Sequence, residues 1–224
     1  EGPSSLSGSV VTASDQTFND SVSLEGNVSL EAGGSITLGG SIDGGHDLTV
    51  NASGVTSFGG NVGLVAPLGN LTTDAGGSSV LSAEHLSVSG TVLFGDRLTL
   101  GGATTLSAHS VRLGDGIAGA GHDLTVNTTE AVSINGSWSG LGSLTSEGPA
   151  LLSGTMTTAS GQVYNGSVDL DADVVLEAGG NITLGGSIDG GHDLTVNTSG
   201  VASCAGSVGF VAALGNLTTD AGGS

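Results

Sequence analysis

The amino-acid sequence repeats itself with a long, fixed period. Glu1, Asp74 and Glu147 stand at the same phase, and similar text follows each of them. Residues 31–78 return as residues 177–224 with only eight substitutions. A fixed period means that each copy has the same structural role, and stacked copies bury a core that one copy could not bury alone. The sequence therefore predicts a solenoid or fibre.

The repeat boundaries suggest one continuous segment. We expect residues 1–224 to form a single repetitive unit, divided into copies 1–73, 74–146 and 147–219, with a fourth copy starting at 220–224. The middle copy has diverged most but keeps the phrase GHDLTVN. The chain begins without Met and shows no signal peptide, so we expect a mature product or part of a longer protein.

Short runs that alternate apolar and polar residues recur along the chain. Examples are SVSL at Ser21, SITL at Ser35, DLTV at Asp47 and RLTL at Arg97, separated by Gly-Gly, Asp-Gly or Asn-Gly. Period-two patterns bounded by turn residues are typical of β-strands. The pattern predicts an all-β protein with almost no helix, in which residues such as Val50 point inward.

Regularly spaced asparagines suggest the length of one coil. Asn165, Asn181, Asn197 and Asn216 are 16, 16 and 19 residues apart, and a further step of 22 would complete the period. This spacing predicts a parallel β-solenoid of about 18 residues per coil, with four coils in each 73-residue repeat.

Composition excludes several classes of protein. The chain has 43 Gly, yet its mean hydropathy is +0.27, which favours an ordered β protein over a disordered one. The net charge is −19, with Arg97 and Arg112 as the only basic residues besides histidine. Binding to nucleic acid or to an anionic membrane surface needs a basic patch, so we expect neither. No apolar run reaches the roughly 18 residues of a membrane span, so we expect no membrane insertion.

Two longer motifs resemble a known family. LEAGGSITLGGSIDGGHDLTVN at 30–51 and LGNLTTDAGG at 68–77 resemble the repeats of filamentous-haemagglutinin-like exoproteins, which include the high-molecular-weight adhesins. These are large bacterial surface adhesins, often exported by two-partner secretion. The resemblance implies a right-handed parallel β-helix outside the cell. It also implies glycosylation, because asparagines in N-x-S/T are glycosylated in the high-molecular-weight adhesins.

The strongest chemical signal is a set of sequons. Ten of the eleven asparagines begin N-x-S/T without a central proline, which is typical of exposed glycan acceptors in exported proteins. The predicted N-glycosylation sites are Asn19, Asn27, Asn51, Asn70, Asn127, Asn135, Asn165, Asn181, Asn197 and Asn216.

The predicted coil length orders these sites in space. It places Asn165, Asn181, Asn197 and Asn216 in one row along one face, and likewise Asn51 with Asn70. Asn27 and Asn135 would lie on a second face. The alternative is that the asparagines form hydrogen-bonded ladders at the turns and carry no sugar.

Other reactive residues suggest no catalytic or metal site. His46, His122 and His192 each precede an aspartate, but adjacent residues of a strand point to opposite faces, so we expect polar turns and not metal ligands. The run from Asp169 to Asp173 lacks the Gly and Glu of a calcium loop. We therefore expect no cofactor.

The lone cysteine marks a core position. Cys204 stands where the first copy has Phe58, so we expect a buried apolar site there.

These observations predict an extracellular structural protein and not an enzyme. We expect an adhesin shaft or a filament that stacks end to end with further repeats or subunits. It would carry covalent glycans and could contact a host or matrix surface. The alternative is a carbohydrate-active β-helix enzyme or a carbohydrate-binding module, although near-uniform repeats are unlike an active site.

Overall fold

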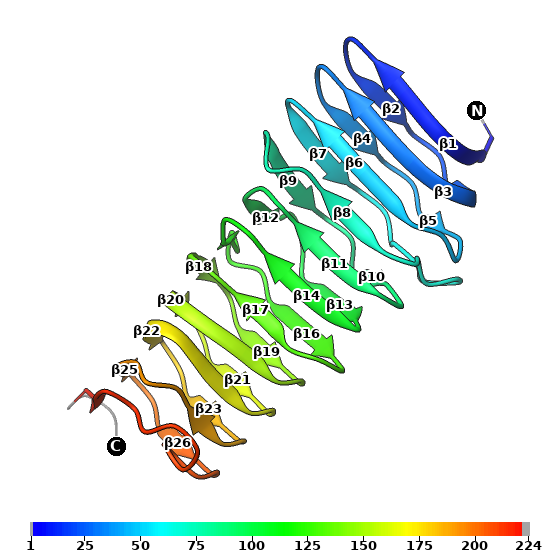
Figure 1. Cartoon of the computed structure of the whole chain (residues 1–224). Helices are drawn as coiled ribbons and strands as arrows, with labels where there is room; N and C mark the ends of the chain where they lie inside the picture. Colours follow the sequence, from blue (N-terminus) through cyan, green and yellow to red (C-terminus); the bar gives the residue numbers. More distant parts are fainter. Residues whose placement is uncertain (1, 221–224) are drawn as a thin grey trace. The chain divides into compact units, whose positions relative to one another are not determined.

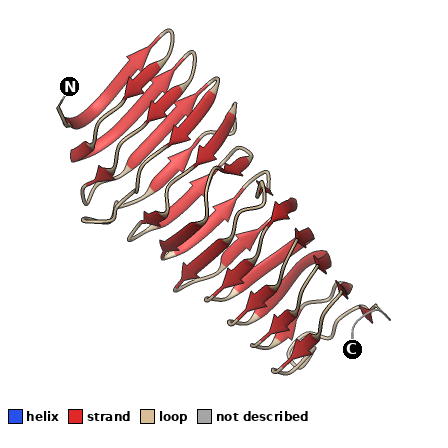
Figure 2. Cartoon of the chain, turned by 180° about the vertical axis from the view of Figure 1, so that it is seen from behind, coloured by secondary structure: helices blue, strands red, loops and turns tan. Residues whose placement is uncertain are grey.

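The structure, a computed structural model, describes residues 2–220. Residues 221–224, most of the predicted start of a fourth repeat, lie outside the described part of the chain. The described residues form 27 strands and no helix (Figure 2). The chain divides into two units, Glu1–Asp115 and Gly116–Ser224, which are described separately.

The first unit contains fourteen strands. They are β1 (Ser4–Thr12), β2 (Gln16–Phe18), β3 (Val22–Ala32), β4 (Ile36–Leu38), β5 (Ile42–Asp43), β6 (Leu48–Ala52), β7 (Val55–Phe58), β8 (Leu71–Thr73), β9 (Ser78–Leu81), β10 (His85–Ser87), β11 (Thr91–Phe94), β12 (Leu98–Leu100), β13 (Thr104–Ala108) and β14 (Ser110–Leu113).

The second unit contains thirteen strands within the described residues. They are β15 (Ile117–Ala118), β16 (Leu124–Thr128), β17 (Val132–Ile134), β18 (Ser137–Leu141), β19 (Leu144–Ser146), β20 (Ala150–Thr158), β21 (Gln162–Tyr164), β22 (Val168–Ala178), β23 (Ile182–Leu184), β24 (Ile188–Asp189), β25 (Leu194–Thr198), β26 (Ala202–Cys204) and β27 (Leu217–Thr219).

In the first unit the strands stack as successive coils. Each coil passes through three short strands, for example β4, β5 and β6, and each strand pairs in parallel with the strands one coil away (Figure 1). The coils differ in length. A side-chain contact from Asn27 to Asp47 crosses one coil and spans 20 residues, whereas the next, from Asp47 to Asn70, spans 23 residues.

The second unit is built in the same way. Gln162 pairs with Ile182, and Ile182 pairs with Ala202 one coil later. Hydrogen bonds between neighbouring coils span 18 residues at Asn165, 20 residues at Asp193 and 23 residues at Asn216.

The predicted parallel β-solenoid is therefore confirmed in each unit. The usual coil, as between Asp173 and Asp193, is longer than the predicted one. A repeat such as residues 147–219 consequently holds fewer than four coils.

The core of each unit is a set of apolar stacks. Strand residues alternate between inward and outward, and inward residues of successive coils lie above one another. In the first unit Val28, Leu48, Leu71 and Val92 form such a stack, and all are buried. Val50 is fully buried, which confirms its predicted inward orientation. Outward positions are left free for polar side chains, and these carry the candidate sites.

Candidate functional site

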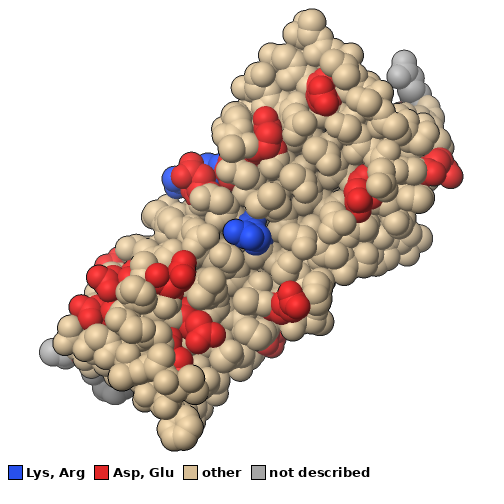
Figure 3. All heavy atoms as spheres, viewed as in Figure 1, with Lys and Arg blue, Asp and Glu red and all other residues tan. Residues whose placement is uncertain are grey.

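All ten sequon asparagines are exposed or partly exposed to solvent. Six are exposed and four, Asn51, Asn127, Asn135 and Asn197, are half-buried. No sequon asparagine is buried, and all ten lie among the described residues. The surface around them is acidic: on the face shown in Figure 3, carboxylates are scattered over each unit.

The predicted asparagine row is wrong. One coil after Asn181 the chain reaches Val201, whose backbone N–H donates to the Asn181 side chain, and not Asn197. Asn197 pairs instead with Glu177. Because the spacing between these sequons is shorter than this coil, Asn181 lies at a turn whereas Asn197 lies within β25.

Asn51 and Asn70 are separated in the same way. Asn51 pairs with Glu31 on the preceding coil, whereas Asn70 bonds to Asp47. The two asparagines therefore do not share a row along one face.

In place of the row, the structure has a ladder of side chains at one corner of the first unit. The backbone N–H of Asp47 donates to Oδ1 of Asn27 (3.1 Å), and Nδ2 of Asn27 donates to Oδ2 of Asp47 (3.4 Å). On the next coil Nδ2 of Asn70 donates to Oδ1 of Asp47 at 2.8 Å. Oδ1 of Asn70 then accepts the N–H of Thr91 at 2.9 Å. The ladder supplies acceptors for backbone N–H groups where the coil turns.

The second unit has the corresponding ladder. The backbone N–H of Asp193 donates to Oδ1 of Asp173 at 3.0 Å, and Nδ2 of Asn216 donates to Oδ1 of Asp193 at 2.9 Å. Asp173 therefore occupies the position of Asn27 and accepts the same bond. The hydrogen bonds that the ladder alternative predicted are present at Asn27, Asn70 and Asn216.

Other sequon asparagines also bond to neighbouring coils. Oδ1 of Asn181 accepts the N–H of Val201 at 2.9 Å, as the hydroxyl of Ser35 does for Val55 at 3.1 Å. Nδ2 of Asn165 donates to the carboxylate of Glu147 at 2.8 Å. Polar side chains at the corners thus act as bridges between coils.

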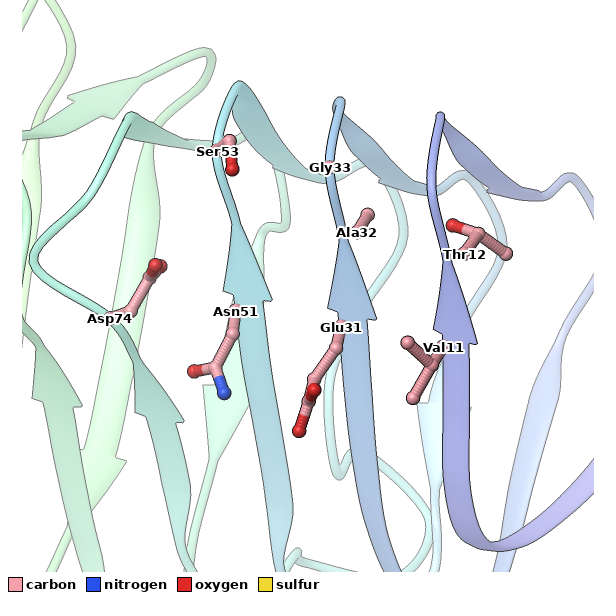
Figure 4. A pocket seen from close by; sticks show the side chains of 8 residues that line it. All are labelled: Val11, Thr12, Glu31, Ala32, Gly33, Asn51, Ser53 and Asp74. Atoms are coloured by element: carbon pink, nitrogen blue, oxygen red, sulfur yellow. The ribbon is translucent and has the colours of Figure 1, made fainter.

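Asn51 and Asn197 lie in a groove that the chain builds twice. The first groove is an open hollow of about 410 Å³ lined by Glu31, Asn51, Ser53 and Asp74, among others (Figure 4). The second is about 310 Å³ and is lined by the corresponding residues of the second unit, Asn197 among them. The shared lining follows from the internal repeat, because residues 31–78 return as residues 177–224.

The geometry of the groove follows from strand pairing. In Figure 4 Glu31, Asn51 and Asp74 lie on three successive coils, with Asn51 on the middle coil. The side chains of Glu31 and Asn51 point toward one end of the strands, and that of Asp74 points toward the turn at the other end. Oδ1 of Asp74 also accepts the N–H of Ala52 at 3.4 Å, which fixes this carboxylate at the groove. The side chains of Asn51 and Asn197 make no hydrogen bond to described residues. These two carboxamides are open to an external ligand.

The histidines and the aspartate run form no metal site. Among residues 2–220, no three His, Cys, Asp or Glu side chains come together as metal ligands. Nδ1 of His192 lies 3.9 Å from Oδ1 of Asp173, which belongs to the ladder of the second unit.

One buried carboxylate was not predicted. Asp96 is 3 % exposed, and its oxygens accept hydrogen bonds from Thr73 Oγ1 (3.3 Å) and Ser79 Oγ (3.1 Å). Burial raises the pKa of Asp96, while the two hydroxyl bonds lower it and nearby Asp74 raises it. Both partners lie on other coils, so pairing across coils had to be known before this site could be found.

The expectation that Cys204 is buried is wrong. Phe58, its counterpart, is 1 % exposed because Leu81 of the next coil covers it. Cys204 is exposed, because no described strand lies on the outer side of β26. Partial burial still raises the pKa of its thiol.

Each unit also presents an apolar loop that sequence reasoning missed. Val65 is 85 % exposed and Phe210 is 85 % exposed, each in one of the longer coils. Asp43 Oδ1 accepts the N–H of Val65 at 2.8 Å, and Asp189 Oδ1 accepts that of Val211 at 2.8 Å, so both loops are anchored. The extra length of these coils is the sequence feature that could have indicated the two loops.

Comparison with known proteins adds no assignment: no family model, curated protein or solved structure matches this chain. No helix in the described part of the chain is long and apolar enough to cross a membrane.

Proposed function

We propose that the protein is an extracellular structural element, a glycosylated β-solenoid that serves as an adhesin shaft or as the subunit of a filament. The observation that carries this proposal is the uniform stacking within each unit. Parallel main-chain pairing continues from coil to coil, and side-chain ladders tie the corners together. Such a fold is stabilised by nearest-neighbour contacts and extends by adding coils, which suits a spacer.

The surface supports the same role. It is acidic, and ten sequons reach solvent at least partly. Like charge keeps elongated proteins soluble, and sugars would add a hydrophilic coat. The buried positions of Trp138 and Tyr164 agree with this proposal, because neither ring is available to stack on a sugar substrate.

In the proposed end-to-end assembly, a further coil would pair with the last described coil. Leu217 is 48 % exposed, whereas its counterpart Leu71 is buried beneath the following coil. A further coil seated on β27 would bury Leu217 in the same way. This arrangement gives the filament a specific contact to test.

Electron microscopy of purified protein over a concentration series tests the filament role. Concentration-dependent fibres select the filament, and Leu217→Asp should abolish them. Val65→Asp adds the same charge at an exposed loop position away from β27 and should leave fibres intact. Monomeric protein at every concentration would select the adhesin shaft.

The alternative of a carbohydrate-active enzyme or binding module rests on the grooves, where carboxylates flank an amide. Incubation with a panel of polysaccharides tests it. Release of reducing ends, or retention of the protein on one polysaccharide, would replace the structural proposal. We expect neither.

A further inference from the structure

We propose that, of two pairs of sequons, Asn51 and Asn197 in the two grooves carry sugar, and that Asn70 and Asn216 in the ladders stay unmodified. The inference rests on the proposed glycosylation and specifies which sequons take part. Asn51 and Asn70 of the first copy correspond to Asn197 and Asn216 of the third, and all four begin a sequon, so sequence alone does not separate them. Their hydrogen bonds distinguish the groove asparagines from the ladder asparagines.

The ladder asparagines are held by their neighbours. Nδ2 of Asn70 donates to Asp47 at 2.8 Å while its Oδ1 accepts the N–H of Thr91 at 2.9 Å. Nδ2 of Asn216 donates to Asp193 at 2.9 Å. Nδ2 is the atom that a glycan would occupy. Presenting it to a sugar donor requires the carboxamide to rotate out of the ladder, which at Asn70 leaves a backbone N–H without its acceptor.

Comparison of the first and third copies shows what the ladder requires. The first copy has Asn27 where the third has Asp173, and both accept a backbone N–H from the next coil, at 3.1 and 3.0 Å. An aspartate cannot carry an N-linked sugar. The property retained at this rung is therefore an acceptor oxygen, and the sequon at Asn27 is incidental to it.

The groove asparagines have the opposite properties. The middle residue of each sequon, Ala52 or Thr198, faces the core and is at most 3 % exposed. Asn51 and Ser53 consequently both line the first groove, as Asn197 and Ser199 line the second. The acceptor amide and the hydroxyl of the sequon thus face the same open space, and the amide makes no hydrogen bond to described residues.

The groove suits a first sugar residue. Hollows of about 410 and 310 Å³ fall in the range of small-ligand sites, roughly 300–1,000 Å³. Glu31 and Asp74 lie one coil to either side of Asn51, and their carboxylates accept hydrogen bonds from sugar hydroxyls. Glu177 and Asp220 occupy the same positions around Asn197.

The modification itself is a glycosyl transfer from an activated glycosyl phosphate, catalysed by a separate transferase. A bond forms between Nδ2 and the anomeric carbon of the sugar. The bond from that carbon to the phosphate oxygen breaks, and the phosphate leaves with its electron pair. One Nδ2 proton passes to a base. The product keeps one N–H and the carbonyl oxygen of the side chain.

Peptide mapping of protein from the cells that make it tests the assignment. Cleavage before aspartate yields peptides 47–73 and 193–219, each with one groove and one ladder asparagine. We expect each peptide to carry a single sugar chain, localised by fragmentation to Asn51 or Asn197. Sugar at Asn70 or Asn216 at equal or higher occupancy would overturn the inference while leaving glycosylation in place. Unmodified asparagine at all ten sequons would refute the glycosylation as well.

Variants provide a second readout. Asn51→Gln with Asn197→Gln should remove the mass added to both peptides and leave the melting temperature of unglycosylated protein unchanged. Asn70→Gln with Asn216→Gln should leave the added mass in place and lower that melting temperature by several degrees. The reverse pattern would show that the grooves are structural and the ladders modified.

Discussion

A buried glutamine offers a test of the stacked core, because the first and third copies of the repeat satisfy its hydrogen bonds differently. In the second unit Gln162 Nε2 donates to the carbonyls of Met156 (3.0 Å) and Glu177 (2.8 Å). Tyr164 completes the site by donating its hydroxyl to Gln162 Oε1 at 3.1 Å. Burial raises the pKa of Tyr164, so the hydroxyl remains a donor well into the alkaline range.

The first unit lacks the last of these bonds. Gln16 Nε2 donates to Val10 O (3.1 Å) and Glu31 O (2.7 Å), as its counterpart does. Phe18 stands where the second unit has tyrosine, and the buried Oε1 of Gln16 has no partner among the described residues. The same buried glutamine site thus exists with a tyrosine hydroxyl in the second unit and without one in the first.

The reciprocal substitutions should change stability in opposite directions. Tyr164→Phe leaves a buried acceptor unpaired and should cost about 1–3 kcal/mol. Phe18→Tyr supplies the missing donor and should add about 0.5–1.5 kcal/mol, the net value of one hydrogen bond. As a control, Tyr164→Phe in a Gln162→Leu background removes a hydroxyl that no longer has this acceptor, so it should cost less than in the parent protein.

Unfolding in urea measures the effect. Trp138, the only tryptophan, is fully buried in the second unit, and its fluorescence reports unfolding there. Hydrogen exchange of β2 and β4 amides reports the first unit, which is needed because repeat arrays can unfold in stages. An unchanged midpoint for Tyr164→Phe, with the slope against urea also unchanged, would refute the role given to Gln162.

Further substitutions test inward orientation, backbone conformation and buried charge. Val50→Asp places a charge in the core and should lower the free energy of unfolding by several kcal/mol, whereas Val65→Asp should change it by less than about 0.5 kcal/mol in urea titrations. Gly77→Ala should lower the melting temperature, because Gly77 has φ of 73° and a Cβ there would overlap the carbonyl oxygen of Gly54, whereas Gly45→Ala meets no atom within 4 Å and serves as control. The raised pKa of Asp96 makes the folded state bind its proton more tightly, so this group stabilises the fold most at low pH and the effect is lost as pH rises through the folded pKa. Asp96→Asn should remove that part of the pH dependence, measured as urea midpoints between pH 4 and 7, and should not destabilise the protein at pH 7.

The fold class was predictable because inward residues repeat at period two within a strand, and such strands recur once per coil along the chain, at spacings of 18 to 23 residues. The coil length was not obtained correctly, because sequons are not bound to one corner. A better signal is the phrase LGGSI at 38–42, which returns as FGGNV at 58–62. Strand pairing joins these segments directly, Leu38 to Phe58 and Ile42 to Val62.

The candidate sites were harder to predict, since each depends on which residues become neighbours across coils. Asp47 bonds to Asn27, 20 residues before it, and to Asn70, 23 residues after it. A single coil length therefore does not predict both contacts. The grooves need the same information. An error of a few residues in the assumed coil length changes which residue is expected beside each position on the next coil. It does not change which residues of a strand point inward or outward.

Substitutions between the first and third copies show what the fold requires at a position. Asn27 and Asp173 differ in charge but keep the acceptor oxygen, and Ser35 and Asn181 differ in size but also keep one. The corners therefore constrain one atom of each side chain and not the residue type. Identity between the copies, as at Asn51, carries no such information, because residues 31–78 and 177–224 differ at only eight positions. The positions that differ are therefore the ones that reveal what the fold requires.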